Sequence, residues 1–231
     1  MESMPRRARV VIPGVYHHAT QRGNDRQDVF FTDDDRQAYL AQLGRQCRKH
    51  RLQVHGYCLM TNHVHLIVIP EELTSLANAL GRAHWQYAQI INELHGRSGH
   101  LWTGRFYSFP LDRPHFIRAM RYVERNPVRA GIVKRAWEYP WSSAPAHLGE
   151  PDASGLLRLA EWEEARADLD WRDVLTEPMD ERELKRYRRH LSTGRPLGSD
   201  RFIAKLETVL GRRLRPLRPG RPRKPGKQAR K

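Results

Sequence analysis

Two histidines stand one residue apart in TNHVHLIV, residues 61–68. Successive side chains of a β-strand point to opposite faces, so His63 and His65 share a face while Val64 and Leu66 point the other way. Neutral imidazole is the commonest metal ligand among side chains. Two rings on one pleat could hold a divalent ion and leave positions open for a substrate. An isolated pair of this kind is more often satisfied by ordinary hydrogen bonds, so the pair alone leaves both interpretations open.

The segments around this strand alternate between two apolar periodicities. A period of two marks strand-like segments, and helical spacing marks the segments between them. Thr61 and Asn62 separate two strand-like segments, and two residues of this kind are typical of a hairpin turn. The expected strands are 14–23, 53–60, 63–70 and 104–112, and the expected helices are 33–52, 75–96 and 113–127. The order β-α-β-β-α-β-α predicts an α+β fold, a ferredoxin-like antiparallel sheet with helices on one face.

The chain changes character after residue 149, so we expect three parts. Residues 1–149 form the sheet-bearing domain, and residues 150–210 form a helical extension. The extension is acidic at first and ends in two short helices, 183–191 and 199–211. Residues 211–231 are rich in arginine and proline and have no apolar period, which predicts a basic tail that is disordered when free.

The net charge of +15 indicates a polyanionic partner, most often nucleic acid. Arginine greatly exceeds lysine, and the guanidinium group is suited to bidentate contact with phosphate. A basic surface that serves only solubility is the alternative interpretation.

The sequence lacks the motifs of several other classes of protein. It contains no apolar run of membrane-span length and no signal peptide, so we expect a cytoplasmic protein, associated with the nucleoid through DNA, and no membrane partner. Cys47 and Cys58 form no CxxC pair, which favours reduced thiols. A zinc site that adds Cys58 or His55 to the histidine pair has no supporting motif spacing. No P-loop is present, so no nucleotide cofactor is expected.

Five segments together carry a family resemblance. GYCLMTNHVHLIVIP (56–70) with YVERNPVRAG (122–131) resembles the single-tyrosine HUH transposases, and most closely the transposase-like proteins associated with repetitive extragenic palindromes. YHHATQRGNDRQDVFF (16–31), GRSGHLWTGRFYSFPLD (96–112) and YPWSSAPAHLG (139–149) are similar to that family's segments, in the same order. The resemblance covers roughly residues 5–149, and TGRPLGSDRF (193–202) resembles an extension found in some members.

The resemblance implies a catalytic site. It makes Tyr122 the nucleophile and adds Asn126 to His63 and His65 as a ligand of a divalent metal ion, Mg²⁺ or Mn²⁺. The implied reaction is cleavage and transfer of single-stranded DNA through a 5′-phosphotyrosine ester. An ordinary phenol has a pKa of about 10, so it needs a polarised phosphate as its target. Four residues separate Tyr122 from Asn126, which would place both on one face of the expected helix 113–127.

Each of these roles has a plain structural alternative. Tyr122 competes with seven other tyrosines, and a helical tyrosine is more often a packing residue. Asn126 precedes Pro127 and could simply end the helix. His17 matches a family histidine, but we expect it to be a packing residue or to contact the metal ligands without binding the metal itself. Tyr107 stands where a basic residue is usual in the family, and Thr61 stands where a proline is common.

Residues that contact DNA are harder to assign from the sequence. The expected set is Arg105, Arg118, Arg121, Arg125, Arg129, Arg212, Arg213 and Arg215. Trp85 and Trp102 could stack on unpaired bases, although core packing is the commoner role of tryptophan.

The expected partner is single-stranded or hairpin DNA, bound by a monomer or a homodimer. A non-catalytic nucleic-acid-binding module with the same fold is the main alternative function. A metal-dependent hydrolase, in which water attacks the phosphate, is a weaker alternative.

Overall fold

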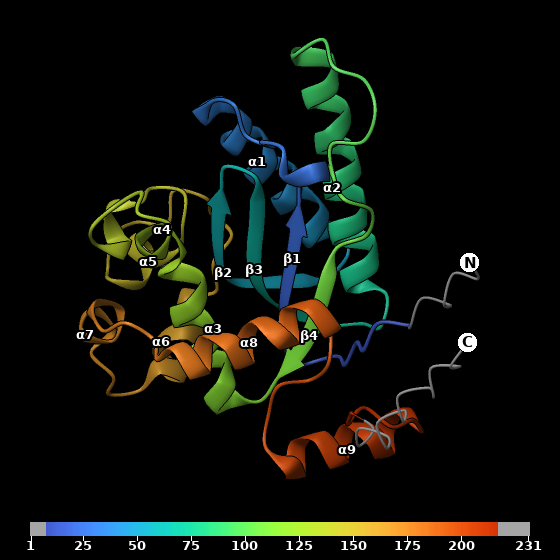
Figure 1. Ribbon diagram of the computed structural model, residues 1–231, viewed down its shortest axis with the longest axis vertical. Coiled ribbons are helices and arrows are strands. Elements are labelled where there is room, and N and C mark those ends of the chain that lie inside the picture. Colours follow the sequence, from blue (N-terminus) through green and yellow to red (C-terminus); the bar gives the residue numbers. More distant parts are fainter. Residues whose placement is uncertain (1–7, 217–231) are drawn as a thin grey trace, which may run out of the picture.

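A computed structural model describes residues 8–216, and its centre is a four-stranded antiparallel sheet (Figure 1). The strands are β1 (Tyr16–Arg22), β2 (Leu52–Met60), β3 (His63–Pro70) and β4 (Tyr107–Leu111), in the spatial order β2-β3-β1-β4. Thr61 and Asn62 join β2 to β3, as the sequence predicts. The sheet confirms the predicted ferredoxin-like arrangement within an α+β fold.

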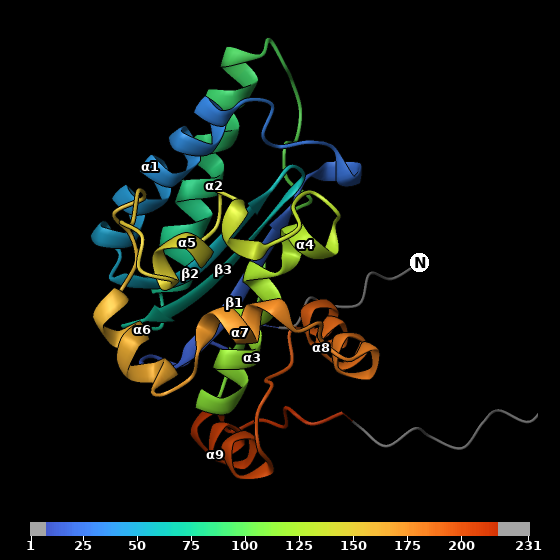
Figure 2. The ribbon, with the colours of Figure 1, turned by 90° about the vertical axis from the view of Figure 1, so that its left-hand side faces the viewer.

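Helices α1 (Asp33–Lys49) and α2 (Ser75–Leu94) cover one face of the sheet (Figure 2). A capping box formed by Thr32 and Asp35 begins α1. The core on this side contains side chains such as Leu43 from α1, Tyr87 from α2 and Leu66 from β3. These are the two helices that the β-α-β-β-α-β order places on one face.

Helix α3 (Arg113–Glu124) packs on the opposite face of the sheet. The sequence predicted one helix that continues to Pro127, and this boundary is wrong. The helix is interrupted at Arg125, and Asn126 begins the short helix α4 (Asn126–Arg129). Pro127 contributes to the interruption because it has no N–H group to bond to the carbonyl of Val123.

Residues after α4 complete the cover of this second face. They contain short helical turns η2 (Ala136–Glu138) and α5 (Ala144–His147), and then α6 (Leu159–Arg166), α7 (Trp171–Thr176), α8 (Glu181–Thr193) and α9 (Asp200–Leu210). A further turn, η1 (Asn24–Arg26), follows β1. The predicted helices 183–191 and 199–211 correspond to α8 and α9.

The segment from residue 150 shares a core with α3. Trp162 and Trp171 are buried in that core. The carboxylate of Glu124, at the end of α3, is buried and accepts hydrogen bonds from Ser143, His147 and the indole N–H of Trp171. These bonds fasten α3 to α5 and α7 from its last residue.

The ordered chain extends past residue 211. Leu214 is buried against Val10 and Leu206, and Arg215 pairs with Glu207. The remainder of the predicted tail, residues 217–231, lies outside the described residues. Between residues 8 and 216, no helix has the length and apolar character needed to cross a membrane.

Candidate active site

The histidine face of β3 meets a polar stretch of β1. His63 pairs with Arg22 and His65 with Thr20 in the antiparallel register, and paired residues share a face of the sheet. This is the face covered by α3 and α8. His65 is buried, His63 is half-buried, and their ring centroids lie 5.0 Å apart.

The hydrogen bonds of Asn62 fix the tautomer of His63. The amide of Asn62 donates from Nδ2 to the carbonyl of Arg26, so its Oδ1 is the atom that accepts a bond from His63 Nδ1, at 2.7 Å. Nδ1 therefore carries the proton, and Nε2 of His63 keeps a free lone pair. Burial lowers the pKa of His63 to about 4, with further lowering by Arg22 and Arg129, so the ring is neutral at pH 7.

His65 belongs to a buried chain of hydrogen bonds. Its Nδ1 lies 2.9 Å from Nε2 of His18, and Nδ1 of His18 lies 2.6 Å from the hydroxyl of Tyr187 on α8. Burial lowers the pKa of His18 to about 3 and that of His65 well below its usual value. Both rings are therefore neutral, and His65 Nε2 is the nitrogen left over for a ligand.

Tyr122 lies directly over the second histidine. Its ring centroid is 5.7 Å from that of His65, with the rings perpendicular, and 4.3 Å from that of Tyr187. The guanidinium of Arg129 lies over the Tyr122 ring at 4.3 Å and donates to Oδ1 of Asn126 at 2.6 Å. The phenol, two imidazoles and an amide thus meet in one place.

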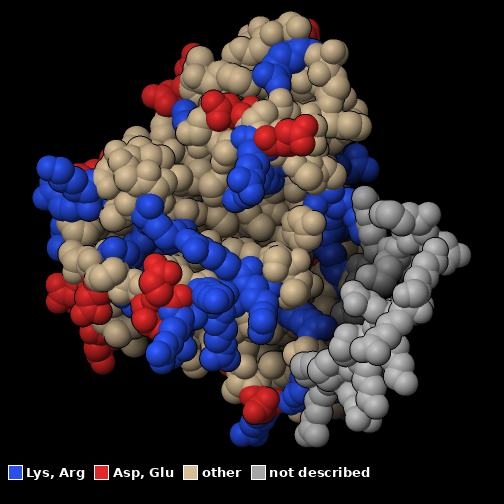
Figure 3. All heavy atoms as spheres, viewed as in Figure 1, with Lys and Arg blue, Asp and Glu red and all other residues tan. Residues whose placement is uncertain are grey.

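These groups line a cavity of about 560 Å³ between the sheet, α3, α4 and α8. Arg22, Arg129 and Arg188 supply positive charge, and no Asp or Glu lines the cavity among the described residues. Figure 3 shows Lys and Arg side chains gathered on the face where α8 lies in Figure 1. An anionic ligand would therefore be attracted to the cavity.

The donor set is compatible with a divalent metal ion. No three His, Cys, Asp or Glu side chains within residues 8–216 are grouped to hold one. The cavity instead presents two imidazole nitrogens and the amide oxygen of Asn126, which has a second lone pair besides the one that Arg129 uses. Nδ2 of Asn126 is buried and has no acceptor among the described residues. The two nitrogens favour Mn²⁺ over Mg²⁺, whose preferred ligands are oxygens.

The other predicted DNA-contacting arginines lie elsewhere. Arg105 is exposed two residues before β4 and lines a neighbouring cavity. Three arginines of the α3 region bind the segment that follows residue 150 instead: Arg118 approaches Glu183, Arg121 donates to the carbonyls of Glu177 and Pro178, and Arg125 donates to that of Leu175. Arg212, Arg213 and Arg215 contact the carbonyls of Ala8, Pro216 and Asp200.

Sequence reasoning missed His18, Tyr187 and Arg188. It considered His17 instead, which lies on the opposite face with its ring bonded to the backbone of Val15 and Ile12. Strand alternation puts His18 on the same face as Thr20, but only the pairing of β1 with β3 brings it beside His65. Tyr187 is separated from His18 by 169 residues, and no local pattern indicates that contact.

The two tryptophans considered for base stacking, Trp102 and Trp85, differ in their exposure. Trp102 is buried, and its indole N–H donates to the carbonyl of His84, so it is a core residue. The side chain of Trp85 is 62% exposed on α2.

Comparison with known proteins places this chain in a family. Residues 12–126 match the model of the family described as "Transposase IS200 like". A REP-associated tyrosine transposase, solved bound to a REP hairpin, is similar in fold, with a TM-score of 0.54 and 19% identity over 68% of this chain and 90% of that chain. A Deinococcus radiodurans R1 protein described as a candidate transposase aligns with a TM-score of 0.37 and 17% identity over 52% of this chain and 96% of its own. No protein with a curated description matches. The matched residues include the whole sheet and both Tyr122 and Asn126, and the chain belongs to the IS200-like transposase family.

Proposed function

We propose that this protein cleaves and rejoins single-stranded DNA, with Tyr122 as the nucleophile. One observation carries the proposal: the phenol of Tyr122 lies beside His63, His65 and Asn126 in a single arginine-lined cavity. A tyrosine buried only for packing would not require two neutral imidazoles beside it, or an amide whose Nδ2 has no acceptor among the described residues.

The proposed reaction is a phosphoryl transfer in which one P–O ester bond forms as another breaks, so the number of ester bonds does not change. The hydroxyl oxygen of Tyr122 attacks the phosphorus of the scissile phosphodiester and loses its proton. The bond from phosphorus to O3′ breaks, O3′ leaves with a proton as a free hydroxyl, and the 5′ phosphate stays on Tyr122. The 3′-OH of another strand can then attack the ester, so joining requires no ATP.

The residues around the phenol have separate tasks in this step. Arg129 packs on the ring of Tyr122 and holds Asn126, so it positions both. Arg22 and Arg188 provide positive charge for phosphates on either side of the scissile one. His63, His65 and Asn126 would hold Mg²⁺ or Mn²⁺, which when bound polarises a non-bridging phosphate oxygen and stabilises the charge of the transition state.

We further propose that the substrate contains a hairpin or palindromic repeat. This part rests on the solved relative that is bound to a REP hairpin. Helices α3 and α8 of one chain both line the cavity. This supports the proposal that a monomer cleaves the strand, while a homodimer would serve the exchange of two strands.

The test is covalent trapping. The wild-type protein, incubated with Mn²⁺ and labelled hairpin DNA, should form an adduct that survives a denaturing gel, and Tyr122→Phe should bind the DNA but form none. Tyr107→Phe is the matched control, because Tyr107 lines the same cavity and its side chain is exposed. An adduct in Tyr122→Phe would refute the nucleophile.

Two further outcomes would favour the alternative functions. Free 5′ ends without a protein–DNA ester would indicate a hydrolase. DNA binding that is insensitive to EDTA and to His63→Ala, with no cleavage, would indicate a binding module.

A further inference from the structure

The active-site cavity continues into two others around the start of β4. A second cavity of about 420 Å³ shares Thr103 and Tyr107 with the active site. It also shares Arg9 and Arg105 with a third cavity of about 600 Å³. The three cavities therefore adjoin one another in a row, here called the path, that extends from Tyr122, past the exposed Tyr107, to α2.

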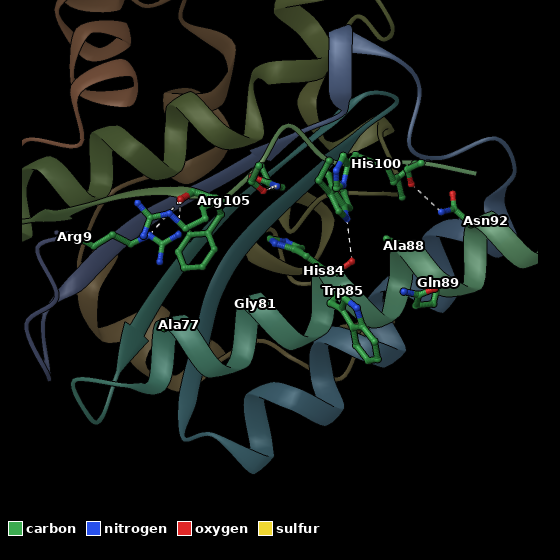
Figure 4. A pocket seen from close by; sticks show the side chains of 16 residues that line it. Arg9, Ala77, Gly81, His84, Trp85, Ala88, Gln89, Asn92, His100 and Arg105 are labelled. Carbon is green, nitrogen blue, oxygen red and sulfur yellow. Dashed lines mark hydrogen bonds between the residues drawn. The ribbon is translucent and has the colours of Figure 1, made fainter. Parts of the chain in front are cut away.

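The third cavity, here called the α2 groove, runs between α2 and the segment 99–106 (Figure 4). Ala77, Gly81 and Ala88 keep the α2 side open, and a Cβ at Gly81 would meet no atom within 4 Å. Buried aromatic rings, among them Trp102 and Phe106, form the floor. Trp85 also lines the groove and is largely exposed, so its indole is accessible to a ligand.

Arg9 and Arg105 mark one end of the α2 groove, as Figure 4 shows. Arg9 donates from Nε and Nη2 to the carbonyl of Phe106, and its guanidinium lies 3.7 Å over the Phe106 ring. Its position is therefore fixed. Burial lowers the pKa of Arg9, and the neighbouring Arg105 lowers it further. Neither arginine forms an ion pair among the described residues, so an anion between them would relieve their repulsion.

The residues that line the path are of the kinds expected in a binding site for single-stranded DNA. None of the three cavities is lined by Asp or Glu within the described part of the chain. Two other cavities, by contrast, contain Glu71 and Glu183. Positive charge for the backbone, combined with exposed aromatic rings for the bases, is the usual way to bind single strands without sequence preference.

We propose that the α2 groove binds an unpaired nucleotide of the DNA strand that leaves the active site. The base stacks on Trp85, and a phosphate binds between Arg9 and Arg105. The path over Tyr107 carries the intervening nucleotides. This inference rests on the proposed function, because the strand is the one that Tyr122 cleaves.

Trp85→Ala tests the stacking contact with the full-length protein. Its affinity for a single strand long enough to reach the groove should fall about fivefold or more, the lower end of what one base–aromatic stack contributes. Oligonucleotides shortened from either side of the scissile phosphate should identify a length below which wild type and variant bind equally. Leu94→Ala and Arg82→Ala are controls, since both residues are exposed on α2 but line none of the cavities.

Abasic substitution links the protein change to one nucleotide. Removing the base that occupies the groove should weaken wild-type binding about as much as Trp85→Ala does, and should not weaken binding of the variant further. Additive losses at every position would overturn the contact. The melting temperature of free Trp85→Ala should equal that of wild type. A large drop would mean that the chain itself covers the indole, and this too would overturn the proposal.

Gly81→Trp tests the space, because it fills the groove from the helix. It should weaken binding of long strands and leave short ones unaffected, whereas Gly81→Ala should bind both as wild type does. If Trp85→Ala and Gly81→Trp bind and cleave like wild type while Tyr122→Phe forms no adduct, the groove proposal fails and the function stands. If wild type forms no adduct at all, the proposed function fails first.

Discussion

The direction of the hydrogen bonds from Tyr187 decides whether His65 can bind a metal ion. If Tyr187 donates to His18, and His18 to His65, then Nε2 of His65 carries its proton and cannot be a ligand. If His65 donates from Nδ1 to His18, and His18 donates to the oxygen of Tyr187, then Nε2 of His65 is free. Only the second direction gives the cavity two imidazole ligands, and it requires an acceptor at each step.

His18→Phe should therefore weaken binding of Mn²⁺ by about 10- to 100-fold, because Nδ1 of His65 loses its acceptor. The measurement is titration calorimetry with Mn²⁺ alone, which does not depend on activity. His55→Phe is the control, since His55 is also buried but its ring nitrogens have no hydrogen-bond partner within residues 8–216. Equal Mn²⁺ affinity in wild type and His18→Phe would show that His18 does not orient a ligand.

The sequence could indicate the groups that react but not those that orient them. His63, His65, Tyr122 and Asn126 stand in local patterns, and all four line one cavity. Their metal-binding and catalytic roles remain predictions. The bonds from His18 to His65 and Tyr187 join three separate elements, so only the folded chain reveals them.

At the scale of elements, one close approach sets the position of the tyrosine helix. Gly56 lies at a register shift in β2, against the side chain of Met120 on α3. A Cβ at Gly56 would be 2.2 Å from the sulfur of Met120 and 3.1 Å from Oγ of Ser143. Met120 is two residues before Tyr122, so the contact helps to fix the height of Tyr122 above the sheet.

Gly56→Ala should lower the free energy of unfolding by about 1–3 kcal/mol, the usual cost of overpacking a core. It should also slow adduct formation, because α3 must move away from β2. Gly81→Ala is the matched control, and it should raise stability by about 0.5–1 kcal/mol because it adds a methyl group in open space on a helix. Urea denaturation measures both. A Gly56→Ala protein as stable as wild type would mean that Met120 repacks freely.

Strands and helices of the first 127 residues were predictable because their apolar periods are regular. The break at Arg125 was not recognised, although Pro127 contains the signal. Its consequence is local: Asn126 begins a new helix and still reaches the cavity beside Tyr122.

At the scale of the whole molecule, both faces of the sheet are buried. The sequence predicted helices on one face and a separate extension, because an acidic and polar segment such as 150–183 gives no indication of where it docks. The buried apolar side chains of this segment pack in the core on the α3 side of the sheet, and they are Trp162, Trp171, Leu175 and Met179. The extension thereby supplies α8 as a wall of the active site.

Neutral histidines are buried on both faces of the sheet, so we expect the protein to lose stability in acid. Burial lowers the pKa of His17 to about 4 and that of His84 to about 3, against 6.5 for an exposed ring. Between these values the unfolded chain binds more protons than the folded one. Stability is therefore complete above pH 6.5 and falls as the pH is lowered toward 4, by at most about 1.4 kcal/mol per pH unit for each ring.

Urea denaturation at pH 7, 6 and 5 measures this slope. His84→Gln should make it shallower, because the amide can keep the bond with the Tyr39 hydroxyl and does not titrate. An unchanged slope in His84→Gln would show that this ring does not contribute to acid unfolding.

The charge beyond residue 216 permits a prediction about salt. Deletion of residues 217–231 removes seven Lys and Arg residues but keeps Leu214 in its cluster and Arg215 on Glu207. If these cations contact phosphates, the slope of log affinity for single strands against log salt concentration should become shallower by about 0.7 for each lost contact. The loss of all seven cations would change this slope by about five at most. The position of cleavage should not move, because the cavity around Tyr122 is formed by residues up to Ser192. An unchanged salt dependence would show that the tail does not contact DNA. A shifted cleavage site would instead show that the tail takes part in selecting the scissile phosphate. The side chains of the cavity would then not be sufficient to select it.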